Sequence, residues 1–207
     1  MINRLLCVGL LAALVAAPAG AGSKKPAKDG VESTLVNASA YCERVATRAP
    51  GTGILVPTAG RAAIHDGSPP ALGTPDLVKR FAETQPSRHL ASGSPFYVNF
   101  LTEGAQVWAV VYEGTPTCDV VVTGAAGDMP AIAARLAESM RKRGWQIVQS
   151  TPASAAMPLA QHLLTRKVPA AAAPETTVRL QLRALSSAAA DPAGVQLEMS
   201  VLAGTSQ

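Results

Sequence analysis

The chain has 207 residues, of which 48% are hydrophobic and 4% aromatic, and its formal net charge is +4. Much of the basic excess lies in an amino-terminal stretch that contains Arg4, Lys24, Lys25 and Lys28, so that from Val31 onward 14 basic residues accompany 13 acidic ones. A surface that binds nucleic acid needs concentrated basic charge to displace counterions from phosphates, and the near-neutral body therefore excludes nucleic acid as an expected partner.

The first 21 residues follow the three-part pattern of a cleavable secretory signal peptide. Arg4 gives a basic start, an apolar run covers residues 5–17, and small residues precede an expected cleavage between Ala21 and Gly22. The apolar run is shorter than the roughly 20 residues of a transmembrane helix, so we expect no stable membrane insertion after cleavage. A signal retained as an anchor is the alternative. Export predicts a periplasmic or secreted protein.

Cleavage changes both the domain organisation and the cysteine count. We expect a flexible polar tail over residues 22–32 and a single domain over residues 33–207. Cys7 leaves with the signal peptide, and Cys42 and Cys118 remain. In an oxidising compartment this pair predicts a disulfide, which closes a loop of about 75 residues and stabilises the fold by about 4 kcal/mol. Two free buried thiols are the alternative.

The amino-terminal part of the domain has two helical patterns separated by an irregular connection. Apolar residues at three- and four-residue spacing predict a helix over 34–48, with Cys42 facing the core. Residues 49–74 are rich in Gly and Pro, and residues 54–56 are a candidate short strand within them. A proline in the first turn and an apolar stripe predict a second helix over 75–85.

The remaining chain predicts an antiparallel sheet interrupted by one helix. β-rich runs with turn residues between them precede the helix, and four further runs follow it. In the last two runs apolar and polar residues alternate, which is typical of strands with one buried face and one wet face. The expected strands are 96–101, 106–112, 118–123, 145–149, 161–168, 177–185 and 195–201, and the expected helix is 128–143.

The order of these elements, α-α-β-β-β-α-β-β-β-β, predicts an α+β fold. We expect a mostly antiparallel sheet of about six to seven strands with two or three helices packed on one face. The disulfide between Cys42 and Cys118 would join the first helix to the sheet.

Candidate catalytic and metal-binding residues are sparse. His65, His89 and His162 are far apart and lack the spacing of helix-borne metal ligands, so we expect no metal and no cofactor. His65 and Asp66 form the best catalytic candidate, because a loop histidine beside an acid can take part in acid–base chemistry. Adjacent residues on a turn usually point apart, and ordinary turn polarity is the alternative.

Two further motifs have both a functional and a structural interpretation. Gly124 and Gly127 join a strand to a helix, where a phosphate loop would lie, but their spacing and the neighbouring Asp128 favour a helix cap. Trp108 and Tyr112 share one strand face. They predict core packing, with an exposed aromatic patch for a partner or sugar as the alternative.

Since no catalytic set emerges, we expect a non-catalytic periplasmic binding or protein-interaction module. Its partner would be an envelope protein or a small ligand. The alternative is a hydrolase-type periplasmic enzyme with a loop site near His65 and Asp66. The sequence leaves the oligomeric state open.

Overall fold

The computed structural model describes residues 30–49, 62–65, 74–124, 127–170, 173–186 and 194–204. The expected signal peptide over 1–21, its cleavage between Ala21 and Gly22, and the candidate strand over 54–56 lie outside these ranges. Within these ranges, no helix is both long and apolar enough to cross a membrane.

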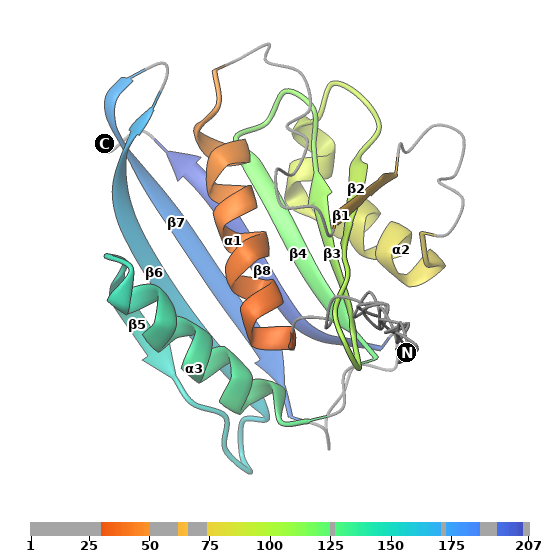
Figure 1. Ribbon diagram of the computed structural model, residues 1–207, viewed down its shortest axis with the longest axis vertical. Coiled ribbons are helices and arrows are strands. Elements are labelled where there is room, and N and C mark those ends of the chain that lie inside the picture. Colours follow the sequence, from red (N-terminus) through yellow and green to blue (C-terminus); the bar gives the residue numbers. More distant parts are fainter. Residues whose placement is uncertain are drawn as a thin grey trace, which may run out of the picture.

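The described chain folds into helices on both sides of one antiparallel sheet (Figure 1). The helices are α1 (Val31–Thr47), α2 (Asp76–Thr84) and α3 (Met129–Lys142), with a short 3-10 helix η1 (Pro86–Leu90) after α2. The strands are β1 (Ala62–His65), β2 (Phe96–Phe100), β3 (Gln106–Val111), β4 (Thr117–Thr123), β5 (Gln146–Thr151), β6 (Leu159–Ala170), β7 (Ala173–Leu185) and β8 (Val195–Gly204).

The strands lie side by side in the order β1-β2-β3-β4-β8-β7-β6-β5, and each neighbouring pair is antiparallel. Two consecutive four-strand units therefore meet where β4 pairs with β8. The predicted α+β class with a mostly antiparallel sheet is confirmed, and all seven expected strands are present. An eighth strand, β1, comes from the connection that was expected to be irregular; its four residues pair with the edge of β2, and so short a run gives little sequence signal.

The first helix begins earlier than its apolar spacing predicts. The backbone N–H of Thr34 donates to the carbonyl oxygen of Gly30 at 3.0 Å, which closes a helical turn before the expected start. The helix therefore begins at Val31 and includes two residues that were assigned to the polar tail.

The helices cover different parts of the two sheet faces. α1 and α3 pack on one face, as expected, whereas α2 packs on the other over the β2–β4 region (Figure 1). The reason is the composition of β3, in which Val107 to Val111 are apolar and buried on both faces. Apolar side chains on both faces need cover on both sides.

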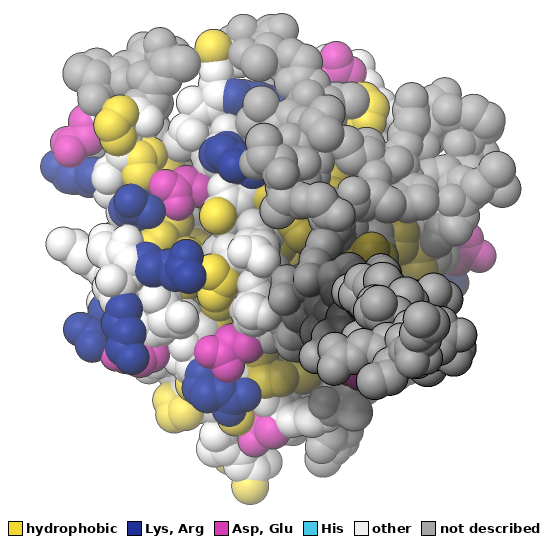
Figure 2. Space-filling view, in the orientation of Figure 1, with side chains coloured by type: hydrophobic (Ala, Val, Ile, Leu, Met, Phe, Trp, Pro, Cys, Tyr) yellow, Lys and Arg dark blue, Asp and Glu magenta, His cyan; other side chains and the backbone are white. Residues whose placement is uncertain are grey.

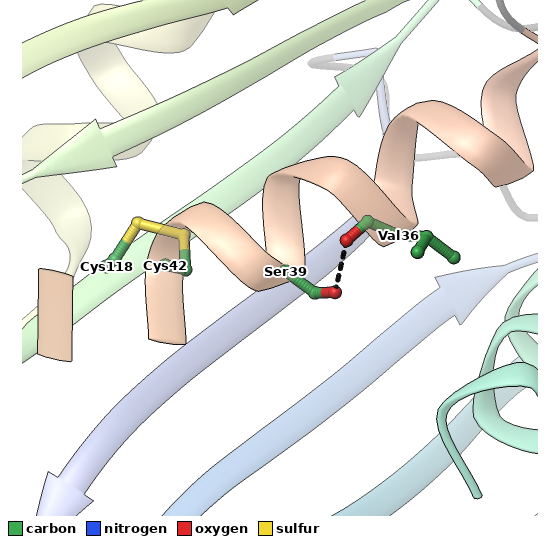
Figure 3. Close-up of a disulfide and its surroundings, with 4 residues drawn as sticks. All are labelled: Val36, Ser39, Cys42 and Cys118. Atoms are coloured by element: carbon green, nitrogen blue, oxygen red, sulfur yellow. Dashed lines mark hydrogen bonds between the residues drawn. A yellow bond between two sulfur atoms is a disulfide. The ribbon is translucent and has the colours of Figure 1, made fainter. Parts of the chain in front are cut away.

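The predicted disulfide joins α1 to the sheet. Cys42 of α1 and Cys118 of β4 are fully buried, with their Cα atoms 5.2 Å apart (Figure 3). One turn earlier on α1, the buried Ser39 hydroxyl donates to the carbonyl oxygen of Val36 at 2.7 Å. The buried Ser39 hydroxyl is thus satisfied by its own helix.

The connection between β4 and α3 is a helix cap, as predicted. The side chain of Asp128 accepts a hydrogen bond from the backbone N–H of Ala131 at 3.2 Å. Gly124 and Gly127 have positive φ angles of 65° and 135°, which favour glycine. A carboxylate therefore occupies the helix N-terminus where a bound phosphate would lie.

The face that carries α1 and α3 has interleaved charges. Figure 2 shows acidic and basic side chains next to each other on this face. Ion pairs account for much of the pattern: Glu32 with Arg135 at 2.9 Å, Glu138 with Arg141 at 2.6 Å, and Glu43 with Arg166 at 3.4 Å. Arg141, in the last turn of α3, is therefore ion-paired with a residue of its own helix.

Candidate functional site

A groove of about 540 Å³ lies on the α2 side of the sheet. Its floor is formed by β4, β8, β7, β6 and β5, and η1 lies beside it. On this side the apolar cluster under α2 extends to Val121 of β4 and Val195 of β8, whereas β7 presents Arg179, Gln181 and Arg183. The groove is therefore the polar part of a sheet face whose other part is core, and no described helix covers it.

The strand register arranges the groove floor in cross-strand rows. The central row contains one side chain from each of the five strands, in the order Asp119, Ser200, Gln181, Leu163 and Gln149. Five strands at a spacing of about 4.8 Å give a row roughly 19 Å long. This length suits an extended ligand that lies across the strands.

A second row and η1 add apolar surface to the groove. Thr117, Leu202 and Arg179 form the adjacent row on β4, β8 and β7. Leu202 is 41% exposed, and Leu90 at the end of η1 is 77% exposed. Exposed leucines beside a polar floor give the groove both hydrogen-bonding and hydrophobic contact surface.

Asp119 is a buried carboxyl group at the β4 end of the floor. Its residue is 2% exposed, and burial raises its pKa to about 6, while the nearby Glu198 acts in the same direction. Hydrogen bonds from the hydroxyl groups of Ser200 and Tyr112 lower the pKa and so oppose the effect of burial. The carboxyl group consequently changes charge near neutral pH.

Arg179 is the basic side chain of the groove lining. It is exposed, and no ion pair engages it in the part of the chain that the structure describes. By contrast, Arg183 on the same strand pairs with Glu198 of β8 at 3.1 Å. The guanidinium group of Arg179 therefore remains available for a negatively charged ligand.

A serine of β5 and a histidine of β6 lie next to each other, and His162 is also among the residues that line the groove. The Oγ atom of Ser150 lies 2.9 Å from Nδ1 of His162, which is 4% exposed and whose pKa is lowered by burial. Among the described residues, no group forms a hydrogen bond with Nε2. A catalytic pair of this type needs a third group that orients the base, and the described surroundings supply none.

The three histidines lie on three different elements, β1, η1 and β6. The backbone of His65 pairs with Tyr97 in β1, and Asp66 lies outside the described residues, so their catalytic role stays a prediction. Among the residues that the structure describes, no three potential metal-ligating side chains gather. Trp108 is 3% exposed beneath α2, which confirms core packing of the aromatic face.

The sequence contains only part of the signal for this groove. Alternation in β7 and β8 identifies a polar face that includes Arg179 and Gln181. Asp119, however, is surrounded in sequence by Cys118 and a run of valines, and a lone acid in an apolar strand was the one local sign of a buried carboxyl group. This single residue is too weak a pattern to predict a site.

Comparison with protein-family models, with curated proteins and with solved structures gave no match for this chain. The function is therefore argued from the groove itself.

Proposed function

We propose that the protein is an exported binding module whose ligand lies in the groove on the α2 side of the sheet. The observation that carries this proposal is the groove floor, where a row of four polar side chains and Leu163 crosses five strands, with no covering helix among the residues that the structure describes. The disulfide between Cys42 and Cys118 is compatible with an oxidising compartment such as the periplasm or the extracellular space.

The chemistry of the lining supports binding in preference to catalysis. Ser200 and Gln181 offer hydrogen bonds, Leu163 and Leu202 offer apolar contact, and Arg179 offers a positive charge. Small-ligand sites are typically concave and partly apolar, with a small number of polar groups that converge on the ligand. Asp119 is the one titratable acid of the lining, and it is held by hydroxyl groups of its own fold.

Export is tested by expressing the full chain in a bacterial host and sequencing the amino terminus of the protein in each cell fraction. We expect the periplasmic or secreted protein to begin at Gly22. Protein that remains in the cytoplasmic fraction and begins at Met1 would contradict export.

Binding is tested by NMR with a defined library of amino acids, short peptides, sugars and organic acids. We expect compounds that shift the side-chain amide signals of Gln149 and Gln181, and we expect these shifts to vanish in Gln181→Trp, which fills the centre of the floor. Asn37→Trp on the exposed side of α1 is the matched control, and it should bind like the wild type. A library that shifts neither amide, or shifts that persist in Gln181→Trp, would overturn the proposal.

A further inference from the structure

We infer that the ligand of the groove is a short peptide whose carboxylate is held by Arg179, an inference that rests on the proposed function. Three features of the lining carry it: the side-chain amides, the apolar contacts and the charge.

The first feature is the number of amide side chains around the groove. Each glutamine offers an acceptor oxygen and two donor hydrogens. A peptide backbone presents the same alternation of donors and acceptors along its length. Three amides on β5, β6 and β7 accompany a ligand across the floor: Gln149, Gln161 and Gln181. Gln85, just before η1, also lines the groove, and its Nε2 donates to the carbonyl oxygen of Phe81 at 3.4 Å.

The second feature is the nature of the apolar contacts. Leu90, Leu163 and Leu202 line the groove, and no Phe, Trp or Tyr is among its described lining residues. The aromatic residues of this sheet face in the described chain, Tyr97, Trp108 and Tyr112, are buried in the cluster beneath α2. Sugar rings favour flat aromatic surfaces, whereas branched aliphatic side chains suit the aliphatic side chains of a peptide.

The third feature is charge complementarity. Arg179 lies in the row next to Gln181 and is exposed in the groove, whereas Arg183 in the following row is already paired with Glu198. A guanidinium group binds a carboxylate through two parallel hydrogen bonds. The carboxylate of a bound peptide therefore fits at Arg179, with its backbone along the amides.

The test uses three pools of tetrapeptides randomised over Ala, Gly, Leu and Val. One pool has free carboxyl termini, the second is amidated, and the third is amidated but carries one glutamate. Retention by the full-length mature protein is measured by ultrafiltration and mass spectrometry, with maltotetraose as a sugar probe. A charge-assisted pair predicts that peptides with a carboxylate are retained about tenfold more than neutral amidated ones.

Substitution of the arginine gives the decisive comparison. Arg179→Gln should abolish the preference for a carboxylate, and Arg179→Lys should retain part of it because charge remains while the two-pronged geometry is lost. Arg135→Gln, on the exposed side of α3, is the control and should keep the full preference. Retention of the free-acid pool identifies a terminal carboxylate, and retention of the glutamate pool a side-chain one; either supports the inference.

The contrary results separate this inference from the proposed function. Equal retention of the acid and amidated pools, or retention of maltotetraose alone, would overturn carboxylate-peptide recognition and leave a binding groove in place. If no probe is retained, the inference fails, and the NMR library with Gln181→Trp then decides whether the groove binds any other ligand.

Discussion

The phenol of Tyr112 connects the carboxyl group of Asp119 to helix α2. Its hydroxyl group lies 3.2 Å from the carbonyl oxygen of Ala82 and also hydrogen-bonds the carboxyl group. Burial, together with the charge of Asp119, raises the pKa of the phenol, which therefore keeps its single proton. When Asp119 is ionised, both acceptors compete for that proton; when Asp119 is protonated, its own hydroxyl can donate to Tyr112, and both contacts form together.

Replacing Tyr112 by phenylalanine should raise the pKa of Asp119 above 6, because the phenol stabilises the ionised carboxylate. The free energy of unfolding should fall by about 1 kcal/mol through the lost hydrogen bond. A ¹³C NMR titration of the carboxyl signal measures the pKa. Tyr97→Phe, in the same apolar cluster, is the control and should leave this pKa in place; an unchanged pKa in Tyr112→Phe would refute the link.

The variant Asp119→Asn should gain stability relative to the wild-type protein as the pH rises. The pKa of Asp119 is about 6 in the folded protein against 3.8 for the ordinary group, so the folded state binds the proton more tightly than the unfolded chain. The stability that Asp119 contributes is therefore full below pH 4, falls as the pH rises to 6, and stays lost above it.

The difference between the two proteins measures this effect. Urea unfolding gives the free energy of unfolding of wild type and of Asp119→Asn at each pH from 4 to 7.5. Across this range the difference between the two values should shift by up to about 3 kcal/mol in favour of the variant. Glu43 and His162, whose pKa values are shifted in opposite directions, are common to both proteins and cancel. A difference that does not vary with pH would contradict the raised pKa.

Removing the hydroxyl of Ser150 should destabilise the protein by about 1 kcal/mol, because His162 then has no partner for either ring nitrogen. Thermal and urea unfolding of Ser150→Ala measure the loss. His162→Leu together with Ser150→Ala should be less destabilised than Ser150→Ala alone, since the buried polar ring has been removed. If the double variant is the less stable of the two, the unpaired ring is not the cause of the loss.

Removing the disulfide should lower the free energy of unfolding by about 4 kcal/mol, because Cys42 and Cys118 lie 76 residues apart in sequence and their bond restricts the unfolded chain. Urea unfolding of the double alanine variant gives the value. Intact mass of the exported protein after alkylation without reductant should show no modification. Uptake of two alkyl groups would contradict the bond in solution.

The elements of this fold were predictable where the local pattern is long and regular, as in α3 and in β7 and β8. The alternation of Leu180 and Leu182 with Arg179 and Gln181 also predicted a solvent-exposed sheet face. The groove was not predictable, because it depends on which strands become neighbours and on the place of η1. The opposite side taken by α2 follows from β3 being apolar on both faces, which period-two alternation does not reveal.

Because β4 pairs with β8, the complete sheet can form only after the last strand has been synthesised. The units β1–β4 and β5–β8 are each built largely from local hairpins. Within the described sheet, Val195–Gly204 is the strand that joins them, and it pairs with residues far back in the chain. Such high contact order slows folding. A chain that ends before β8 therefore has two half-sheets with unpaired edges, and commitment to the native topology comes only when nearly the whole polypeptide is present.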